Sequence, residues 1–217
     1  MIFTIEGNVS AGKTTLLEFL AKTKFNIPHI VCYEPVDDWL NFKMDTDEKS
    51  LFELFYQDPK KHAFSFQMMA LQSRFEHIYK TINENKGKII ICERSFLTDA
   101  EIFAKLQYEE GNISDIDYHI YRKWHAFFLN ILNPDIRGLI YLNTSPEECM
   151  KRISVRNRKG EEDFSKDYMD KLDIKHKNWL YHQEIAPVFE IDGNKDIGHI
   201  EILSKCIVEY INDATSQ

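Results

Sequence analysis

The stretch that decides the fold is Gly7-Asn8-Val9-Ser10-Ala11-Gly12-Lys13-Thr14, with Thr15 directly after it. It matches the phosphate-loop pattern G-x-x-x-x-G-K-[ST], follows an apolar run at 2–5 and leads into a helix-like run at 14–22. The glycines let backbone N–H groups point inward at an anion, and the N-terminal end of the following helix adds its positive dipole. Lys13 is expected to reach the β- and γ-phosphates, and the Thr14 hydroxyl to hold Mg²⁺. The sequence therefore predicts a site for a nucleoside triphosphate.

Short apolar runs recur outward from this loop and alternate with longer helix-like stretches. The apolar runs lie at 2–5, 30–33, 88–92, 139–142 and 188–191. The helix-like stretches lie at 14–22, 49–57, 60–85, 96–107, 116–132, 146–156, 165–183 and 197–212. This alternation is typical of a parallel sheet wrapped by helices. We predict an α/β fold with a five-stranded, doubly wound parallel sheet, in a single domain over residues 1–217.

Composition narrows the function classes. The 217 residues suit one domain that buries its own core without disulfides or a structural metal. The net charge of −8 argues against general binding to nucleic acid, because such proteins normally present a basic face. The cysteines, Cys32, Cys92, Cys149 and Cys206, are widely spaced and form no C-x-x-C pair, so we expect reduced thiols in the core.

The chain carries no sign of a membrane or secretory segment. Its apolar runs stay well below the ~20 residues of a membrane span. The first predicted strand begins at residue 2, which leaves no room for a signal peptide. We therefore expect a cytoplasmic protein without a membrane partner.

Distinctive polar residues follow the first three predicted strands. The phosphate loop follows the first, Glu34-Pro35-Val36 the second and Glu93-Arg94-Ser95 the third. In open α/β sheets, ligands bind in the crevice beyond the carboxyl ends of the strands. The sequence thus predicts that these three segments converge on one site.

The motifs together resemble the cellular and viral deoxynucleoside kinases over nearly the whole chain. The resemblance rests on residues 7–15 and 34–39, on Phe66-Gln67, on Glu93-Arg94-Ser95 and on the arginines at 152, 156 and 158. It is closest to the deoxycytidine/deoxyguanosine kinase branch. The resemblance implies a P-loop kinase fold with an Arg-rich lid at about 152–163, and ATP-dependent 5′-phosphorylation of deoxynucleosides in nucleotide salvage.

The resemblance gives roles to three residues that follow strands. Glu34 matches the carboxylate that takes the proton from the sugar 5′-hydroxyl, which suffices because phosphoryl transfer has a loose transition state. A helix-capping role for Glu34 is the alternative that the local sequence leaves open. Glu93 matches the carboxylate that helps to hold Mg²⁺ through its water shell. Arg94 matches the arginine that contacts phosphate and the 5′ end of the substrate.

Arg152, Arg156 and Arg158 lie where the family has its lid. Arg152 and Arg156 are four residues apart and would share one face of a helix. Guanidinium groups that close over the triphosphate would stabilise charge on the transferred group. A solvated basic helix end is the other interpretation of the same residues.

The resemblance also implies a substrate pocket. Gln67 matches the glutamine whose amide hydrogen-bonds to a base edge. Tyr56 lies eleven residues earlier and matches the tyrosine that binds the sugar 3′-hydroxyl. Val36, Trp39 and Phe103 match the walls around the base.

Arg74 and Asp99 match a charged pair of the deoxycytidine/deoxyguanosine branch. A thymine 5-methyl group against a buried ion pair would leave polar groups unpartnered, at a cost of about 1–3 kcal/mol. Deoxycytidine or a purine deoxynucleoside is therefore expected to be preferred over thymidine. A surface salt bridge remote from the substrate is the alternative.

One position departs from the family pattern. In Lys175-His176-Lys177-Asn178-Trp179, Lys177 stands where we align the family's 3′-hydroxyl-binding glutamate. An ammonium group cannot accept a hydrogen bond. Either sugar recognition rests on Tyr56 with help from elsewhere, or the substrate carries a negative group that Lys177 meets.

Two other activities stay open. A deoxynucleoside monophosphate kinase of the thymidylate-kinase type would explain Lys177, although Glu34, Gln67 and Glu93-Arg94-Ser95 favour a 5′-hydroxyl acceptor. A GTP-binding switch is the second, because residues 135–138 fit D-x-x-G and residues 194–196 are close to N-K-x-D. The first of these precedes its strand and the second lacks a residue, so both matches are weak.

The expected partners are ATP, Mg²⁺, a deoxynucleoside and a second copy of the chain. The run at 118–132 is rich in Tyr, Trp and Phe. It is expected to supply a helix for a homodimer interface, or else to pack only on its own sheet.

Overall fold

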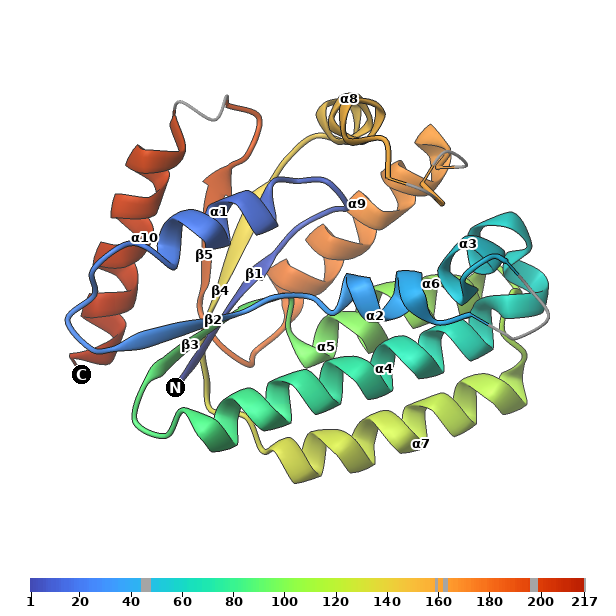
Figure 1. Cartoon of the computed structure of the whole chain (residues 1–217), viewed down its shortest axis with the longest axis horizontal. Coiled ribbons are helices and arrows are strands. Elements are labelled where there is room, and N and C mark those ends of the chain that lie inside the picture. The colour runs from blue at the N-terminus through green and yellow to red at the C-terminus, as the bar shows by residue number, and fades with distance from the viewer. Residues whose placement is uncertain (44–47, 159, 162–163, 196–198, 217) are drawn as a thin grey trace.

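The computed structural model describes residues 1–43, 48–158, 160–161, 164–195 and 199–216. It forms one five-stranded parallel sheet flanked by helices (Figure 1). The strands are β1 (Ile2–Glu6), β2 (His29–Cys32), β3 (Ile89–Glu93), β4 (Ile136–Asn143) and β5 (Val188–Asp192), in the order β2-β3-β1-β4-β5. The predicted α/β fold with five parallel strands is confirmed. β4 begins three residues before the predicted run at 139–142.

The helices also follow the predicted pattern closely. They are α1 (Lys13–Leu20), α2 (Val36–Asn41), α3 (Leu51–Gln57), α4 (Pro59–Glu84), α5 (Phe96–Thr98), α6 (Ala104–Glu109), α7 (Asp115–Leu132), α8 (Pro146–Arg156), α9 (Lys166–His182) and α10 (Ile200–Thr215). Several begin at a serine whose side chain accepts from the third helical N–H, such as Ser114 before α7 and Ser145 before α8. Left-handed Asn133 and Asn157 end the same two helices.

Two helical segments differ from the sequence prediction. The run at 96–107 is interrupted by a π-helical turn, η1 (Asp99–Phe103), and α2 was not predicted as a separate helix. Both are single short turns whose form depends on tertiary contacts rather than on a repeating apolar pattern. Residues 159, 162 and 163 of the predicted lid, residue 196, residue 217 and the first two residues of the predicted helix 197–212 lie outside the described residues.

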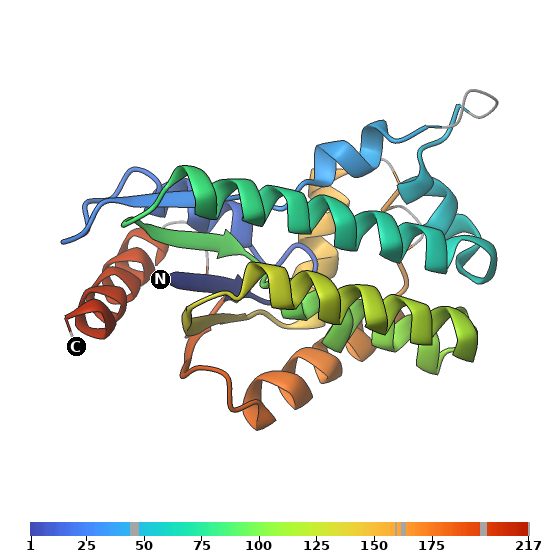
Figure 2. The same cartoon turned by 90° about the horizontal axis from the view of Figure 1, so that it is seen from below.

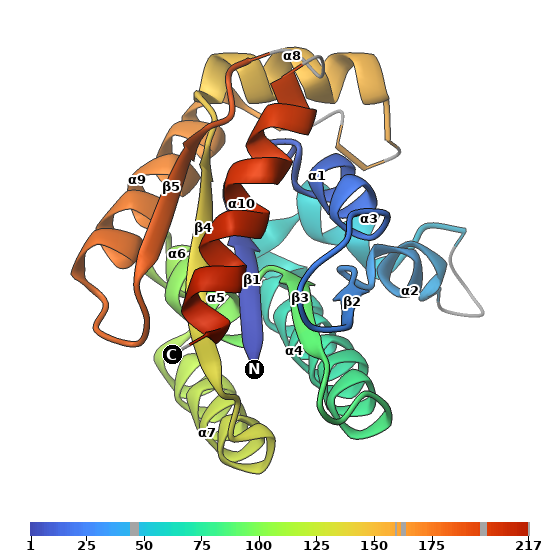
Figure 3. The ribbon, with the colours of Figure 1, turned by 90° about the vertical axis from the view of Figure 1, so that its left-hand side faces the viewer.

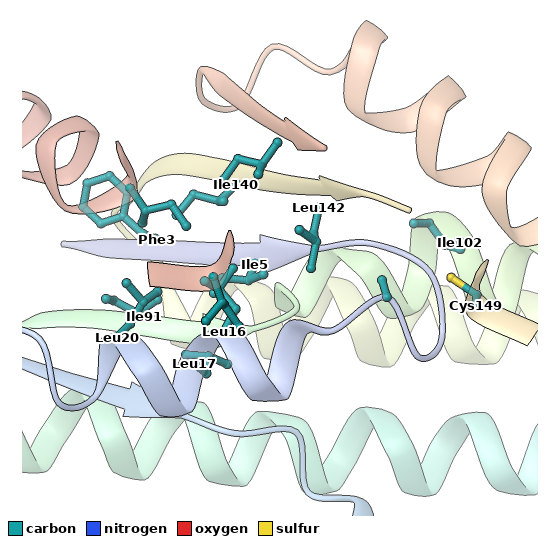
Figure 4. Packing of buried hydrophobic residues seen from close by; sticks show 14 of the residues in the cluster. Phe3, Ile5, Leu16, Leu17, Leu20, Ile91, Ile102, Ile140, Leu142 and Cys149 are labelled. Atoms are coloured by element: carbon teal, nitrogen blue, oxygen red, sulfur yellow. The ribbon is translucent and has the colours of Figure 1, made fainter. Parts of the chain in front are cut away.

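Strand residues alternate between two apolar layers, as the period-two geometry of strands requires. Phe3, Ile5, Ile91, Ile140 and Leu142 pack with the apolar faces of α1 and α10 (Figure 4). These two helices lie beside each other (Figure 3). Buried side chains of this kind contribute about 1.5–3 kcal/mol each.

The opposite layer is built mainly by the long helices. Ile90 and Cys92 of β3 face Leu71 and Ile78 of α4 and Tyr121 of α7. Helices α4 and α7 run side by side along this face and extend beyond the end of the sheet (Figure 2). Of the two, α4 carries the predicted site residues Gln67 and Arg74.

The cysteine prediction is wrong for one residue. Cys32, Cys92 and Cys149 are buried free thiols, whereas Cys206 is free and exposed. The buried stripe of α10 runs through Ile200, Ser204, Ile207 and Ile211, at helical spacing, and Cys206 lies off it. In the described parts of the chain, every helix is too short or too polar to cross a membrane.

Candidate active site

A cavity of about 850 Å³ lies at the carboxyl ends of the strands. Of the residues predicted for the site, all but Gly7 and Asn8 line it. The phosphate loop, the segment after β2, the segment after β3 and the arginines of α8 therefore converge as expected from a parallel sheet. Phe52, Phe66, Ala70 and Glu161 line the same cavity and were not predicted.

Gly7 and Asn8 shape the phosphate loop from behind. Gly7 has φ 148°, and a Cβ added to it would lie 2.7 Å from the Leu142 carbonyl oxygen. The Asn8 side chain donates to the Met169 carbonyl at 3.0 Å, which ties the loop to α9. Gly12, at φ 105°, leads directly into α1. The glycines are thus required where the backbone turns and where it approaches β4.

Lys13 is buried within the loop that it follows. Its ammonium group donates to the carbonyl oxygens of Gly7 at 3.2 Å and Asn8 at 2.8 Å. Burial, and then the charge of Arg94, lower the pKa of Lys13 to about 7. An anion in the cavity would offset both effects, so the side chain is poised for a negatively charged ligand.

Thr14 and Glu93 bring three oxygens together at the start of α1. The Thr14 hydroxyl donates to the Glu93 carboxylate at 2.9 and 3.1 Å. Within the described residues, no group of three or more His, Cys, Asp or Glu side chains forms a metal cage. Mg²⁺ commonly uses one or two protein oxygens together with phosphate and water. The Thr14 and Glu93 oxygens fit that requirement.

Glu34 is held by two arginines. Arg74 Nη2 lies 2.7 Å and Arg94 Nε 3.7 Å from Glu34 Oε1. Burial alone would raise the pKa of Glu34, but Arg94, Arg74 and Lys13 outweigh it and lower the pKa to about 2. The residue before α2 is Pro35, and the helix has no side-chain cap, so the alternative capping role of Glu34 is wrong.

Arg74 connects Glu34 to Asp99. Its Nε lies 2.6 Å from Asp99 Oδ2, and the arginine side chain is only 2% exposed. Burial raises the pKa of Asp99 although Arg74 opposes it, and the two carboxylates raise the pKa of Arg74. The alternative of a surface salt bridge is therefore wrong, because this pair is buried and lines the cavity.

Arg94 occupies an unusual backbone conformation. Its φ is 63°, a left-handed value that costs a non-glycine residue on the order of 1–3 kcal/mol. Its guanidinium is buried and lies 5.0 Å from the centre of the Phe103 ring. Among the described residues, its Nε and Nη1 have no hydrogen-bond partner. Buried donors normally have partners, so this arrangement suits an anionic ligand.

Aromatic side chains form the opposite part of the cavity. The Trp39 indole donates to Ser73 Oγ at 2.8 Å and meets Phe66 edge-on at 5.7 Å between ring centres. Arg74 lies 5.6 Å from the Trp39 ring centre. Gln67 is buried on the same helix, α4. This part offers apolar walls beside one amide and one ion pair, a composition typical of small-molecule sites.

Arg152 and Arg156 of α8, and Arg158 just after it, make two different sets of contacts. Arg152 donates to the Ala11 carbonyl at 2.8 Å and to the Gly193 carbonyl at 2.9 Å, which joins the phosphate loop to the segment after β5. Arg156 and Arg158 instead pair with Glu161, at 2.6 and 3.3 Å. All three line the cavity and pair with protein groups, which favours the lid interpretation over that of a merely solvated helix end.

Glu161 lies in the cavity, whereas Lys177, the residue that departs from the family pattern, lies outside it. The Glu161 side chain is 2% exposed, and its charge adds to burial and to Tyr168 in raising the pKa of Tyr56. Lys177 does not line the cavity and pairs with Asp173 at 2.9 Å. The alternative in which Lys177 meets a negative group of the substrate is not supported. A carboxylate directly after a cluster of basic residues was the only sequence signal for Glu161.

The strand order and the phosphate loop define a P-loop kinase fold, and comparison with known proteins identifies the family. The deoxynucleoside kinase family model matches residues 3–216. A probable deoxycytidine kinase of Fowlpox virus (strain NVSL) is 36% identical, over 99% of this chain and 88% of its own. Deoxycytidine kinase 2 of Gallus gallus is 32% identical, over 96% of this chain and 88% of its own. Mitochondrial deoxyguanosine kinase of Xenopus laevis is 31% identical, over 86% of this chain and 76% of its own.

The chain belongs to the deoxynucleoside kinase family. It is accordingly a phosphotransferase that acts on nucleosides in nucleotide salvage, as the motif resemblance implied. The comparisons give no support to a monophosphate kinase or to a GTP-binding switch.

Proposed function

We propose that this kinase transfers the γ-phosphate of ATP to the 5′-hydroxyl of deoxycytidine or a purine deoxynucleoside, in preference to thymidine. The observation that carries the proposal is the network of partly buried Glu34 with buried Arg74 and Asp99, between the phosphate loop and the aromatic part of the cavity. One end of it reaches the reacting hydroxyl, and the other faces the base. The relatives named for deoxycytidine and deoxyguanosine support this choice of substrate.

Glu34 acts as the general base. The 5′-oxygen attacks the γ-phosphorus, the bond from that phosphorus to the β,γ-bridging oxygen breaks, and the hydroxyl proton passes to a Glu34 oxygen. Because Arg94 and Arg74 keep its pKa near 2, Glu34 is ionised at neutral pH and ready to accept. A weak base suffices because the proton leaves late in a loose transition state.

Positive groups surround the path of the transferred phosphate. Lys13 would contact the β- and γ-phosphates. Arg94 would contact the transferred group through its Nε and Nη1, which make no hydrogen bond within the described residues. Arg152 and Arg156 of α8, with Arg158 just after it, would close as a lid and stabilise the developing charge. The backbone N–H groups of residues 9–15 would hold the remaining phosphate oxygens.

Thr14 and Glu93 would hold Mg²⁺, directly or through water. When bound, the ion supplies charge neutralisation on the β- and γ-phosphates. The hydroxyl and carboxylate already lie within 3.1 Å of each other, which supports a shared site.

Base and sugar recognition follow from the opposite part of the cavity. Gln67 would bind the base edge between Trp39, Val36 and Phe103. The buried Arg74–Asp99 pair would disfavour a thymine methyl group, by about 1–3 kcal/mol. Tyr56 would bind the sugar 3′-hydroxyl, and we propose Glu161 as the carboxylate that accepts from it.

We further propose a cytoplasmic homodimer. Four free cysteines are typical of a reducing compartment. On α7, the exposed side chains of Ile116, Ile120, Trp124, Phe127 and Ile131 form an apolar surface of a kind that normally has a partner. A second copy of α7 would cover it in a two-fold interface.

The test is a panel of the four deoxynucleosides and their 5′-monophosphates, each with ATP and Mg²⁺, with product separated by chromatography. We expect turnover of deoxycytidine or the purine deoxynucleosides, with kcat/KM for thymidine at least tenfold lower. Turnover of monophosphates alone would contradict the proposed 5′-hydroxyl acceptor. Equal turnover of thymidine would contradict the role proposed for Arg74 and Asp99.

A further inference from the structure

Glu6 is a buried carboxylate without a place in the reaction described above. It ends β1, directly before Gly7, and is 0% exposed. Three donors reach its two oxygens: Thr4 Oγ1 and the Ser95 N–H donate to Oε1, each at 2.8 Å, and Thr98 Oγ1 donates to Oε2 at 2.7 Å. Glu6 therefore joins the strand that leads into the phosphate loop to the segment that follows β3.

That segment contains the left-handed residue Arg94. Its own N–H donates to the Ile5 carbonyl at 3.0 Å, and the carbonyl before it, that of Glu93, accepts from Arg74 Nη1 at 3.3 Å. The next peptide N–H, that of Ser95, is held by Glu6. A strained non-glycine conformation persists only where surrounding contacts determine it. Glu6 supplies the contact on the carboxyl-terminal side of Arg94.

The contacts around Ser95 extend this support into α5. Ser95 is the N-cap of that helix, and its hydroxyl and N–H both approach Thr98 Oγ1, at 2.9 and 3.2 Å. The same Thr98 hydroxyl is the one that donates to Glu6. One carboxylate thus fixes both ends of the first helical turn after Arg94.

We propose that Glu6 is a positioning residue, which holds the Ser95 peptide group so that Arg94 stays left-handed and aims its guanidinium at the transferred phosphate. This inference rests on the role proposed for Arg94. Glu6 does not touch the substrate and acts only through the turn. Glu6 in this way fixes the relative position of the two phosphate-binding segments, which follow β1 and β3.

The test compares kcat and KM for deoxycytidine and ATP among wild type, Glu6→Ala and Glu6→Gln, each also made in an Arg94→Ala background. We expect Glu6→Ala to lower kcat by about 10²-fold, as a misplacement near 1 Å does, and to change the deoxycytidine KM less. Glu6→Gln keeps an acceptor oxygen for the Ser95 N–H and should recover most of that loss. In the Arg94→Ala background, either substitution should lower kcat by less than about threefold, because residues that act as a unit are not additive.

Thr4→Val is the matched control. It removes one hydrogen bond to the same carboxylate but leaves the Ser95 and Thr98 contacts, so kcat should stay near wild type. If Glu6→Ala fails to fold, Glu6→Gln decides alone. Its amide can accept from the Ser95 N–H but not also from Thr98, so it should lower kcat by about five- to tenfold, a loss that disappears in the Arg94→Ala background. A loss of equal factor in both backgrounds, or no loss at all, would overturn the proposal. Wild-type kcat in Arg94→Ala by itself would instead refute the proposed role of Arg94.

Discussion

Glu34 is partly buried beside two close arginines, and their charges make its ionisation a source of stability. Its pKa is about 2 in the folded protein and near 4.5 ordinarily, so its contribution is complete above pH 4.5 and is lost as the pH falls toward 2. We expect wild type to exceed Glu34→Gln in free energy of unfolding by on the order of 1–3 kcal/mol at pH 7. Urea unfolding at pH 7, 5, 4 and 3 should show this difference shrinking below pH 4.5. A difference that stays constant down to pH 3 would contradict the account.

Glu161 is a second residue whose surroundings define a testable role. It is buried in the cavity, beside Tyr56 and under Arg156 and Arg158. We expect Glu161→Ala to raise the KM for deoxycytidine by roughly tenfold or more, through loss of a charged hydrogen bond. Dideoxycytidine, which lacks the 3′-hydroxyl, should show a much smaller change in KM. Lys177→Ala is the control, with both KM values unchanged, and an equal effect of Glu161→Ala on the two nucleosides would argue against the contact.

At the scale of elements, the phosphate loop depends on Gly7. Alanine there would meet the Leu142 carbonyl and take an unfavourable φ. We expect Gly7→Ala to raise the KM for ATP at least tenfold and to cost on the order of 1–3 kcal/mol of stability. Gly87→Ala is the matched control, because Gly87 also has positive φ, at 82°, but nothing lies within 4 Å of an added Cβ. An unchanged ATP KM in Gly7→Ala would contradict the proposed loop geometry.

The elements also divide into those the sequence could predict and those it could not. The strands and the long helices carry repeating apolar patterns, so β1 and α7 were located to within a residue or two. The π-helical turn at Asp99–Phe103 has no such local signal. Glu161 was missed for a related reason. Its neighbour Gly160 lies against Phe52 of α3, far away in the sequence, and no local pattern encodes that contact.

At the scale of the whole molecule, the apolar face of α7 predicts self-association. Trp124 and Phe127 are 46% and 54% exposed and lie near each other on that helix. Sedimentation velocity at micromolar concentration should show a dimer for wild type and a monomer for Trp124→Glu/Phe127→Glu. Tyr181→Glu, on α9, changes a comparably exposed aromatic residue and should leave the dimer intact. A wild-type monomer would refute the proposed interface.

The whole fold brings the segments after β1, β2 and β3 to one cavity, which Glu34 lines, and we propose that Glu34 is the base there. The most direct measurement is the initial rate of deoxycytidine phosphorylation with ATP and Mg²⁺, for wild type and Glu34→Gln in parallel, with ATP binding measured separately. If Glu34 is the base, Glu34→Gln should lower kcat by about 10²–10⁴-fold while ATP still binds. A kcat within a few-fold of wild type would contradict the role of Glu34 as the base.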